Sequence, residues 1–172
     1  MNSTYSSGLF WTVKIAGVSG SGKTTILRHL KTSVSWCNII TYSDLLIQFR
    51  IKELADAELS RILENSTGLI VMDEHLEFVN PNRTLNYRRE NTRGLVYLDL
   101  SLPCLLNRIS SDPGRKGVID RTTLQRQLAV SRRSALRLSR KLSIPLLLLQ
   151  NPDNEQANVF RLVAGFLRGL KP

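Results

Sequence analysis

One nine-residue segment constrains this chain more than any other, and it reads Gly17-Val18-Ser19-Gly20-Ser21-Gly22-Lys23-Thr24-Thr25. It matches the pattern G-x-x-x-x-G-K-S/T at every fixed position, between an apolar run and an amphipathic run. Glycines let the backbone turn tightly, so that its amides and the positive end of the following helix can cradle an anion. Lys23 adds a positive charge for the β- and γ-phosphates, and the Thr24 hydroxyl can bind Mg²⁺. The sequence therefore predicts a phosphate loop that binds ATP and Mg²⁺.

Strand-like and helix-like runs alternate along the rest of the chain. Short β-branched runs predict strands, and apolar residues at helical spacing predict helices. The expected strands cover residues 11–16, 37–42, 69–73, 94–100 and 144–150. The expected helices begin near residue 23 or cover residues 44–63, 102–110, 120–142 and 155–170. This order predicts an α/β protein with the three-layer P-loop NTPase fold: one domain, residues 1–172, in which helices flank a five-stranded parallel sheet of order 2-3-1-4-5.

The charge of the chain is concentrated in one segment. The net charge is +10, and residues 83–141 hold fourteen basic and four acidic groups, which alone gives +10. Such a segment attracts phosphates, on a nucleotide or on nucleic acid, so RNA or DNA is a possible partner. The two cysteines have no metal-like spacing, which favours a reducing, cytoplasmic location. We find no signal peptide and no 18-residue apolar run, so no membrane partner is expected.

A second acidic position is expected near the metal. Asp73 ends the apolar run Leu69-Ile-Val-Met, and the carboxyl ends of parallel strands meet at the ligand-binding edge of such sheets. We expect Asp73 to orient Mg²⁺ together with Thr24. Glu74 could polarise an attacking water or could be solvated, and His75 is more often a packing residue than a catalyst.

Four features resemble the archaeal-type adenylate kinases and the related small nuclear adenylate kinase of eukaryotes, within the nucleoside monophosphate kinase branch of P-loop proteins. They are the phosphate loop, the strand end Val71-Met72-Asp73-Glu74-His75, the run Leu105-Leu106-Asn107-Arg108-Ile109 followed by a basic loop and Asp120-Arg121, and the last strand entering Gln150-Asn151. The resemblance implies ATP-dependent phosphorylation of a nucleoside monophosphate. It also implies a lid at about residues 111–121, with Arg108, Arg115 and Arg121 contacting ATP phosphates beside the catalytic Lys23 and Asp73.

The sequence departs from that family on the acceptor side. The segment of about residues 43–68 is short, and Thr41-Tyr42-Ser43-Asp44 replaces the expected turn after the second strand. Arg50, Arg61 and Arg83 are candidates for an acceptor clamp. The alternative function is a P-loop ATPase or regulatory module acting on RNA, DNA or a protein partner, because an Asp-Glu pair at a strand end is common in ATPases. The sequence carries no signal for an oligomeric state.

Overall fold

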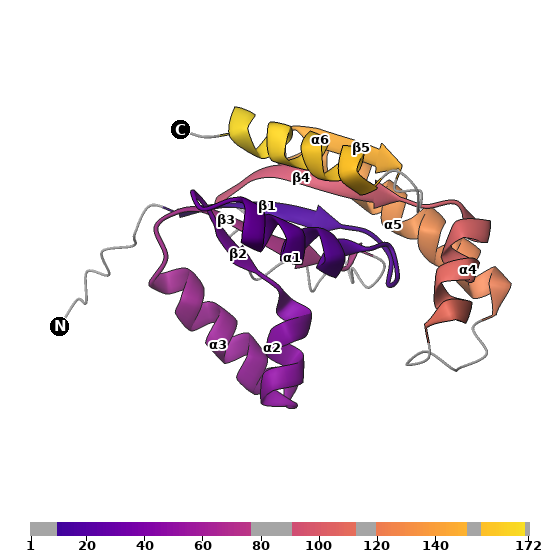
Figure 1. Ribbon diagram of the computed structural model, residues 1–172, viewed down its shortest axis with the longest axis horizontal. Helices are drawn as coiled ribbons and strands as arrows, with labels where there is room; N and C mark the ends of the chain where they lie inside the picture. The colour runs from indigo at the N-terminus through magenta and orange to yellow at the C-terminus, as the bar shows by residue number, and fades with distance from the viewer. Residues whose placement is uncertain (1–9, 77–90, 113–119, 151–155, 171–172) are drawn as a thin grey trace.

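A computed structural model describes residues 10–76, 91–112, 120–150 and 156–170. Its centre is one parallel sheet of five strands in the order β2-β3-β1-β4-β5, and Figure 1 shows the sheet with its helices. The strands are β1 (Phe10–Ala16), β2 (Asn38–Ile40), β3 (Gly68–Glu74), β4 (Thr92–Asp99) and β5 (Leu146–Gln150). The predicted fold class and strand order are therefore confirmed.

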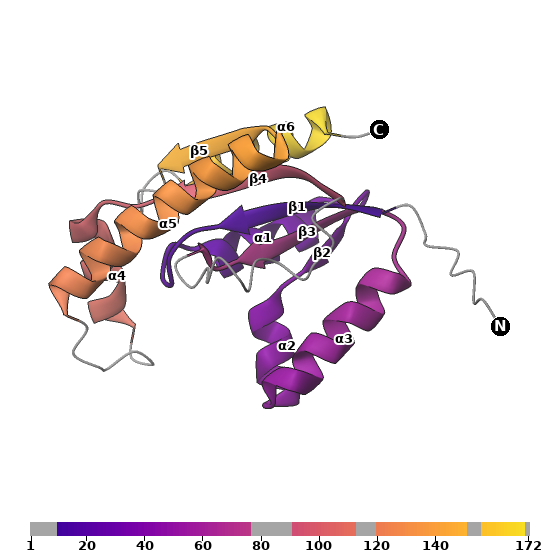
Figure 2. The same ribbon diagram turned by 180° about the vertical axis from the view of Figure 1, so that it is seen from behind.

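Helices cover both faces of the sheet. They are α1 (Lys23–Ser33), α2 (Tyr42–Phe49), α3 (Lys52–Glu64), α4 (Leu102–Ser111), α5 (Arg121–Leu142) and α6 (Gln156–Gly169). Apolar side chains of α1 and α6 form one core with strand residues such as Val13 and Val96. On the opposite face, α3 packs beside Ile70 and Met72, and α5 packs beside Tyr97. Figure 2 shows α5 along this second face. Strands covered on both faces explain the near-continuous apolar runs of the sequence.

The predicted single helix over residues 44–63 is wrong. The structure has two helices, α2 and α3, which meet at Arg50 with a left-handed φ of 58°. Apolar residues continue at helical spacing across this break, and no glycine or proline marks it, so the pattern alone gave no signal. Figure 1 shows the pair projecting away from the sheet.

Caps define the helices near the carboxyl edge of the sheet. The Ser101 hydroxyl caps α4, whose first turn accommodates Pro103. The Asp120 carboxylate accepts hydrogen bonds from the amides of Thr122 and Thr123 at the start of α5. Among the described residues, no helix is long and apolar enough to cross a membrane.

Candidate phosphate-binding site

The segment from Gly17 to Gly22 follows β1 and leads directly into α1. Gly22 occupies the position before the helix with a left-handed φ of 94°, which an L side chain rarely adopts. Gly17 is restricted by space as well. A Cβ there would lie 2.5 Å from the Ser21 hydroxyl oxygen and 3.0 Å from the Leu98 carbonyl oxygen. The loop thus turns with its backbone close to its own side chains and to β4.

Lys23 is folded back over this loop. Its ammonium donates to the carbonyl oxygens of Gly17 and, at 3.0 Å, Val18. The side chain is only 5% exposed. The buried charge is thus held by two main-chain carbonyl oxygens of the loop itself.

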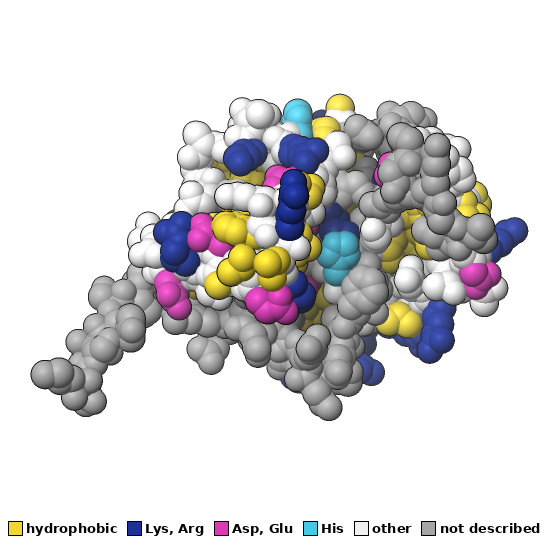
Figure 3. Space-filling view, turned by 90° about the horizontal axis from the view of Figure 1, so that it is seen from below, with side chains coloured by type: hydrophobic (Ala, Val, Ile, Leu, Met, Phe, Trp, Pro, Cys, Tyr) yellow, Lys and Arg dark blue, Asp and Glu magenta, His cyan; other side chains and the backbone are white. Residues whose placement is uncertain are grey.

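A pocket of about 310 Å³ opens beside the loop. Its lining comes from the loop, α1, the start of α2, the end of β3 and α4: Ser19, Gly20, Gly22, Lys23, Thr24, Thr25, Ser43, His75, Arg108, Ile109 and Asp112. Figure 3 looks onto this side of the molecule, where the surface is hollowed between the α2–α3 pair and the α4 end. The pocket thus collects residues that are far apart in the sequence.

Two hydroxyl oxygens that could coordinate Mg²⁺ lie where the start of α1 meets the start of α2. The hydroxyl oxygens of Thr24 and Ser43 are 3.3 Å apart, and both residues line the pocket. Mg²⁺ prefers oxygen ligands and usually keeps several waters and substrate phosphates, so this pair fits a nucleotide-bound ion. No group of three or more His, Cys, Asp or Glu in the described ranges could hold a metal by itself.

Asp73 lies near the start of α2, but its carboxylate is hydrogen-bonded to the backbone. Its carboxylate accepts a hydrogen bond of 2.7 Å from the Tyr42 amide, and the residue is 5% exposed. This bond ties the end of β3 to the start of α2. Asp73 is not among the residues that line the pocket, whereas Ser43 and His75 are.

The arginines predicted to contact ATP have different positions. Arg108 lines the pocket, and its guanidinium donates to the Gly20 carbonyl at 3.3 Å. Arg121 is exposed at the first position of α5 and is not part of the lining. Arg115 and most of the predicted lid, residues 113–119, lie outside the described residues. Of the described arginines in this set, the structure brings only Arg108 to the phosphate loop.

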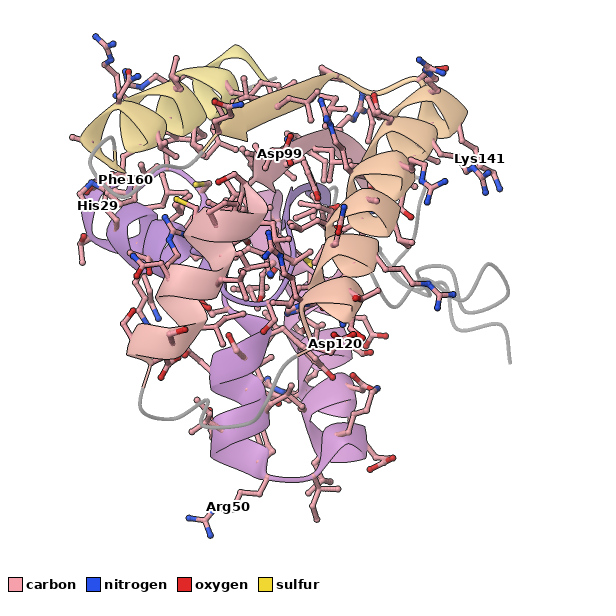
Figure 4. All side chains as sticks on the ribbon, turned by 90° about the vertical axis from the view of Figure 1, so that its right-hand side faces the viewer. His29, Arg50, Asp99, Asp120, Lys141 and Phe160 are labelled. Atoms are coloured by element: carbon pink, nitrogen blue, oxygen red, sulfur yellow. The ribbon has the colours of Figure 1, made fainter. Side chains whose placement is uncertain are left out.

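The proposed acceptor clamp is not assembled on the α2–α3 pair. Arg50 is exposed at the turn between the helices, and Figure 4 shows it pointing away from the sheet. Arg61 forms a two-pronged ion pair with Glu58 on the surface of α3. Arg83 lies outside the described residues.

Glu74 takes neither of its expected roles. Its carboxylate lies 3.7 Å from the ammonium of Lys14, which is 1% exposed in the middle of β1. The Lys14 ammonium also donates to the Met72 sulfur at 3.0 Å, on the side of the sheet covered by α3. Burial lowers the pKa of Lys14, against the opposing effect of Glu74. Burial likewise raises the pKa of Glu74, against the opposing charge of Lys14.

Ser43 and Asp112 line the pocket, although the sequence gave neither a role of its own within the predicted acceptor segment and lid. Ser43 follows β2 at the carboxyl edge of the sheet, and that topological rule could have identified it. Arg28 donates to the Asp44 carboxylate at 2.9 Å and so joins α1 to α2 a second time. Nothing in the local pattern around Asp112 distinguishes it from an ordinary residue after a helix.

Comparisons with known proteins identify the fold. No protein-family model matches the sequence, and no curated protein matches it significantly. A shikimate kinase from Acinetobacter baumannii, solved in complex with shikimate, matches with a TM-score of 0.60 and 14% identity over 93% of this chain and 94% of that chain. A shikimate kinase from Bacteroides thetaiotaomicron matches with a TM-score of 0.56 and 12% identity over 92% and 98%. These likenesses establish a P-loop kinase fold, and they give no support to the narrower adenylate kinase resemblance.

Proposed function

We propose that this chain is a cytoplasmic phosphotransferase that uses Mg-ATP to phosphorylate a small-molecule acceptor. The observation that carries the proposal is the convergence of Lys23, Arg108 and the Thr24–Ser43 hydroxyl pair on one pocket beside a phosphate loop. These residues come from α1, α2 and α4, so only the folded chain assembles them.

The protein groups perform positioning and charge neutralisation. The loop amides and Lys23 would hold the β- and γ-phosphates. Arg108 would approach the transferred group from α4, because its guanidinium already donates a hydrogen bond to the Gly20 carbonyl of the loop. Phosphoryl transfer depends mainly on such positioning and on neutralising charge on the equatorial oxygens. Bound Mg²⁺, held by Thr24 and oriented by Asp73, would supply further neutralisation of the phosphate charge.

The acceptor would lie between the phosphate loop and the α2–α3 pair. Ser43 lines the pocket from the start of α2, and α1 is joined to α2 by the Thr24–Ser43 and Arg28–Asp44 contacts. On the sequence resemblance, the acceptor is a nucleoside monophosphate. The matched kinase solved with shikimate offers a second class, a hydroxylated carboxylic acid.

The ATPase alternative requires a group that activates water. Glu74 was its main support, but that carboxylate is paired with Lys14 on the α3 side of the sheet. We therefore rank acceptor phosphorylation above hydrolysis.

An acceptor screen tests the proposal. Mg-ATP is incubated with the protein and, separately, AMP, CMP, UMP, shikimate or no acceptor, while ADP and phosphorylated product are quantified. We expect one acceptor to raise ADP formation well above the no-acceptor rate, with one phosphorylated product per ADP. Lys23→Ala should abolish this activity, whereas Lys31→Ala, on the exposed side of the same helix, should not. Equal ADP formation in every tube would refute the kinase and favour an ATPase.

A further inference from the structure

The longest helix of the protein carries positive charge only. α5 spans 22 residues, RTTLQRQLAVSRRSALRLSRKL, with seven Lys or Arg and no Asp or Glu. Its apolar side is used by the core, since Leu124 and Ala135 are buried and Leu128 and Leu138 pack against the same clusters. The charges are therefore left on the solvent side.

Five of these cations lie along one side of α5, and we call them the α5 basic stripe. It consists of Arg126, Arg133, Arg137, Arg140 and Lys141, and all five are exposed. Spacings of three, four and seven residues place side chains on one side of a helix. The stripe extends about 22 Å, given the rise per residue of an α-helix. Figure 4 shows nitrogen-tipped side chains projecting outward from α5 near Lys141.

Intramolecular pairing does not account for the stripe. Arg132, which lies off the stripe, reaches the Asp99 carboxylate at 3.4 Å. None of the five stripe cations pairs with an acidic residue of the described ranges. Arg140 and Lys141 lie in the last turn, where cations favour the helix dipole, but Arg126, Arg133 and Arg137 do not. Like charges four residues apart repel, so this arrangement opposes helix stability.

The stripe is also separate from the phosphate pocket. The pocket is lined from the loop, α1, α2, β3 and α4, and no residue of α5 contributes. Figure 4 shows α5 running from Asp120, beside the pocket end of the molecule, to Lys141 at the far end. A nucleotide in the pocket would therefore leave the stripe free for another anion.

We propose that the α5 basic stripe binds the sugar-phosphate backbone of a nucleic acid. Arginine forms two-pronged hydrogen bonds with phosphate, and cations along one side of a helix can contact several phosphates of one backbone. The stripe covers roughly two-thirds of a turn of B-form duplex. With no aromatic residue in α5, it holds phosphates and does not read bases.

An anionic membrane fits this surface less well. Helices that bind membrane surfaces bury an apolar face in the lipid, but the apolar face of α5 is in the core. The exposed large hydrophobic residues of the described ranges lie elsewhere, on α2, α3, β5, α6 and the α2–α3 turn. An acidic protein partner would also require apolar or aromatic anchors, which the stripe lacks.

Salt dependence gives a quantitative test. Five phosphate contacts predict a slope of about −4.5 for log K against log salt with duplex DNA, and about −3.5 with a single strand. Duplex affinity should then fall about 500-fold between 50 and 200 mM NaCl. Fluorescence anisotropy with a labelled 20-nucleotide RNA and a 20-base-pair DNA measures both slopes and shows which form is preferred.

Two triple variants separate the stripe from overall charge. Arg126→Gln/Arg133→Gln/Arg137→Gln removes three stripe cations and keeps good helix formers. The control, Lys31→Gln/Arg161→Gln/Arg168→Gln, removes the same charge from exposed positions on α1 and α6, across the sheet.

We expect the stripe variant to lower the duplex slope to about −1.8, with the control near the parent value and mant-ATP binding retained in both. Retained mant-ATP binding shows that a loss concerns the stripe and not the proposed kinase site. Equal losses in the two variants would overturn the proposal, as would absence of binding to both nucleic acids at 50 mM NaCl. Binding to phosphatidylserine vesicles without binding to nucleic acid would overturn it in favour of a membrane.

Discussion

The buried Lys14–Glu74 pair joins the two neighbouring strands β1 and β3. Replacing its members singly and together should separate the free energy gained by pairing the two charges from the cost of burying them. The Glu74 Oε2 atom is buried and has no hydrogen-bond partner among the described residues. The Lys14–Glu74 distance of 3.7 Å is long for a charge-assisted bond. We consider Lys14→Met, Glu74→Met and the double variant, because methionine approximates the shape of both side chains.

Each single variant should lose stability, whereas the double variant should not. Removing one partner leaves a buried, uncompensated charge, which typically costs about 3–5 kcal/mol. In a chain of 172 residues this corresponds to a fall in Tm of roughly 6–20 °C. Replacing both partners removes both desolvation penalties, so the double variant should be as stable as the parent or up to about 4 kcal/mol more stable.

The pH dependence of each single variant has a definite sign. In Lys14→Met, burial raises the pKa of Glu74 without opposition from Lys14, so folding favours the protonated form. The deficit of this variant should therefore shrink as the pH falls toward 4.5, the ordinary carboxyl value. In Glu74→Met, burial lowers the pKa of Lys14, partly opposed by Asp73, so the deficit should shrink as the pH rises toward 10.5.

Urea unfolding, followed by the fluorescence of Trp11 and Trp36, measures these free energies at pH 5, 7 and 9. The double variant serves as the reference, because it carries neither charge. A double variant clearly less stable than the parent would refute the reasoning, since the pair would then be net stabilising. Deficits that do not change with pH would show that the losses come from packing.

The remaining predictions concern the phosphate site. Asp73→Asn should lower turnover and raise the Mg²⁺ concentration required for half-maximal rate, with mant-ATP affinity nearly unchanged; an unaltered Mg²⁺ titration would exclude a metal-orienting role. Arg108→Ala should reduce kcat by about 10³-fold with little change in the KM for ATP, and a pure KM effect in steady-state assays would assign it to ground-state binding. Gly17→Ala should destabilise the loop by about 1–3 kcal/mol and weaken mant-ATP binding. Its control, Gly165→Ala in α6, has open space around the new methyl group and should stabilise the fold by about 0.5–1 kcal/mol in thermal unfolding.

The fold was predictable because two independent patterns agree on it. The phosphate loop fixes a strand before Gly17 and a helix after Gly22, and the remaining apolar runs alternate as βα units. Right-handed crossovers then leave few possible strand orders. The break at Arg50 was not predictable, because a non-glycine residue adopts the left-handed conformation there with no local signature.

The candidate site could be predicted only where its residues are neighbours in the sequence. The loop and Lys23 follow from one motif, whereas the contact of Ser43 with Thr24 and the bond from Tyr42 to Asp73 depend on how β2 and β3 lie in the sheet. The pairing of Glu74 with Lys14 depends on the register between β1 and β3. The pattern of apolar residues does not show which of the adjacent acids Asp73 and Glu74 would meet Lys14. The roles of Lys23, Thr24, Asp73, Arg108, Arg115 and Arg121 stay predictions.

The strand order also determines when the phosphate loop can form during synthesis. β1 is made first, yet its two neighbours are β3 and β4, and the hydroxyls of Thr12 and Thr92 meet across 80 residues. At roughly 5–20 residues per second, β4 is complete only about 4–17 s after β1. During that interval β1 has an unpaired edge, and Gly17 lacks the Leu98 carbonyl against which it packs. A nascent chain arrested before β4 should therefore expose an apolar strand to aggregation and to chaperones.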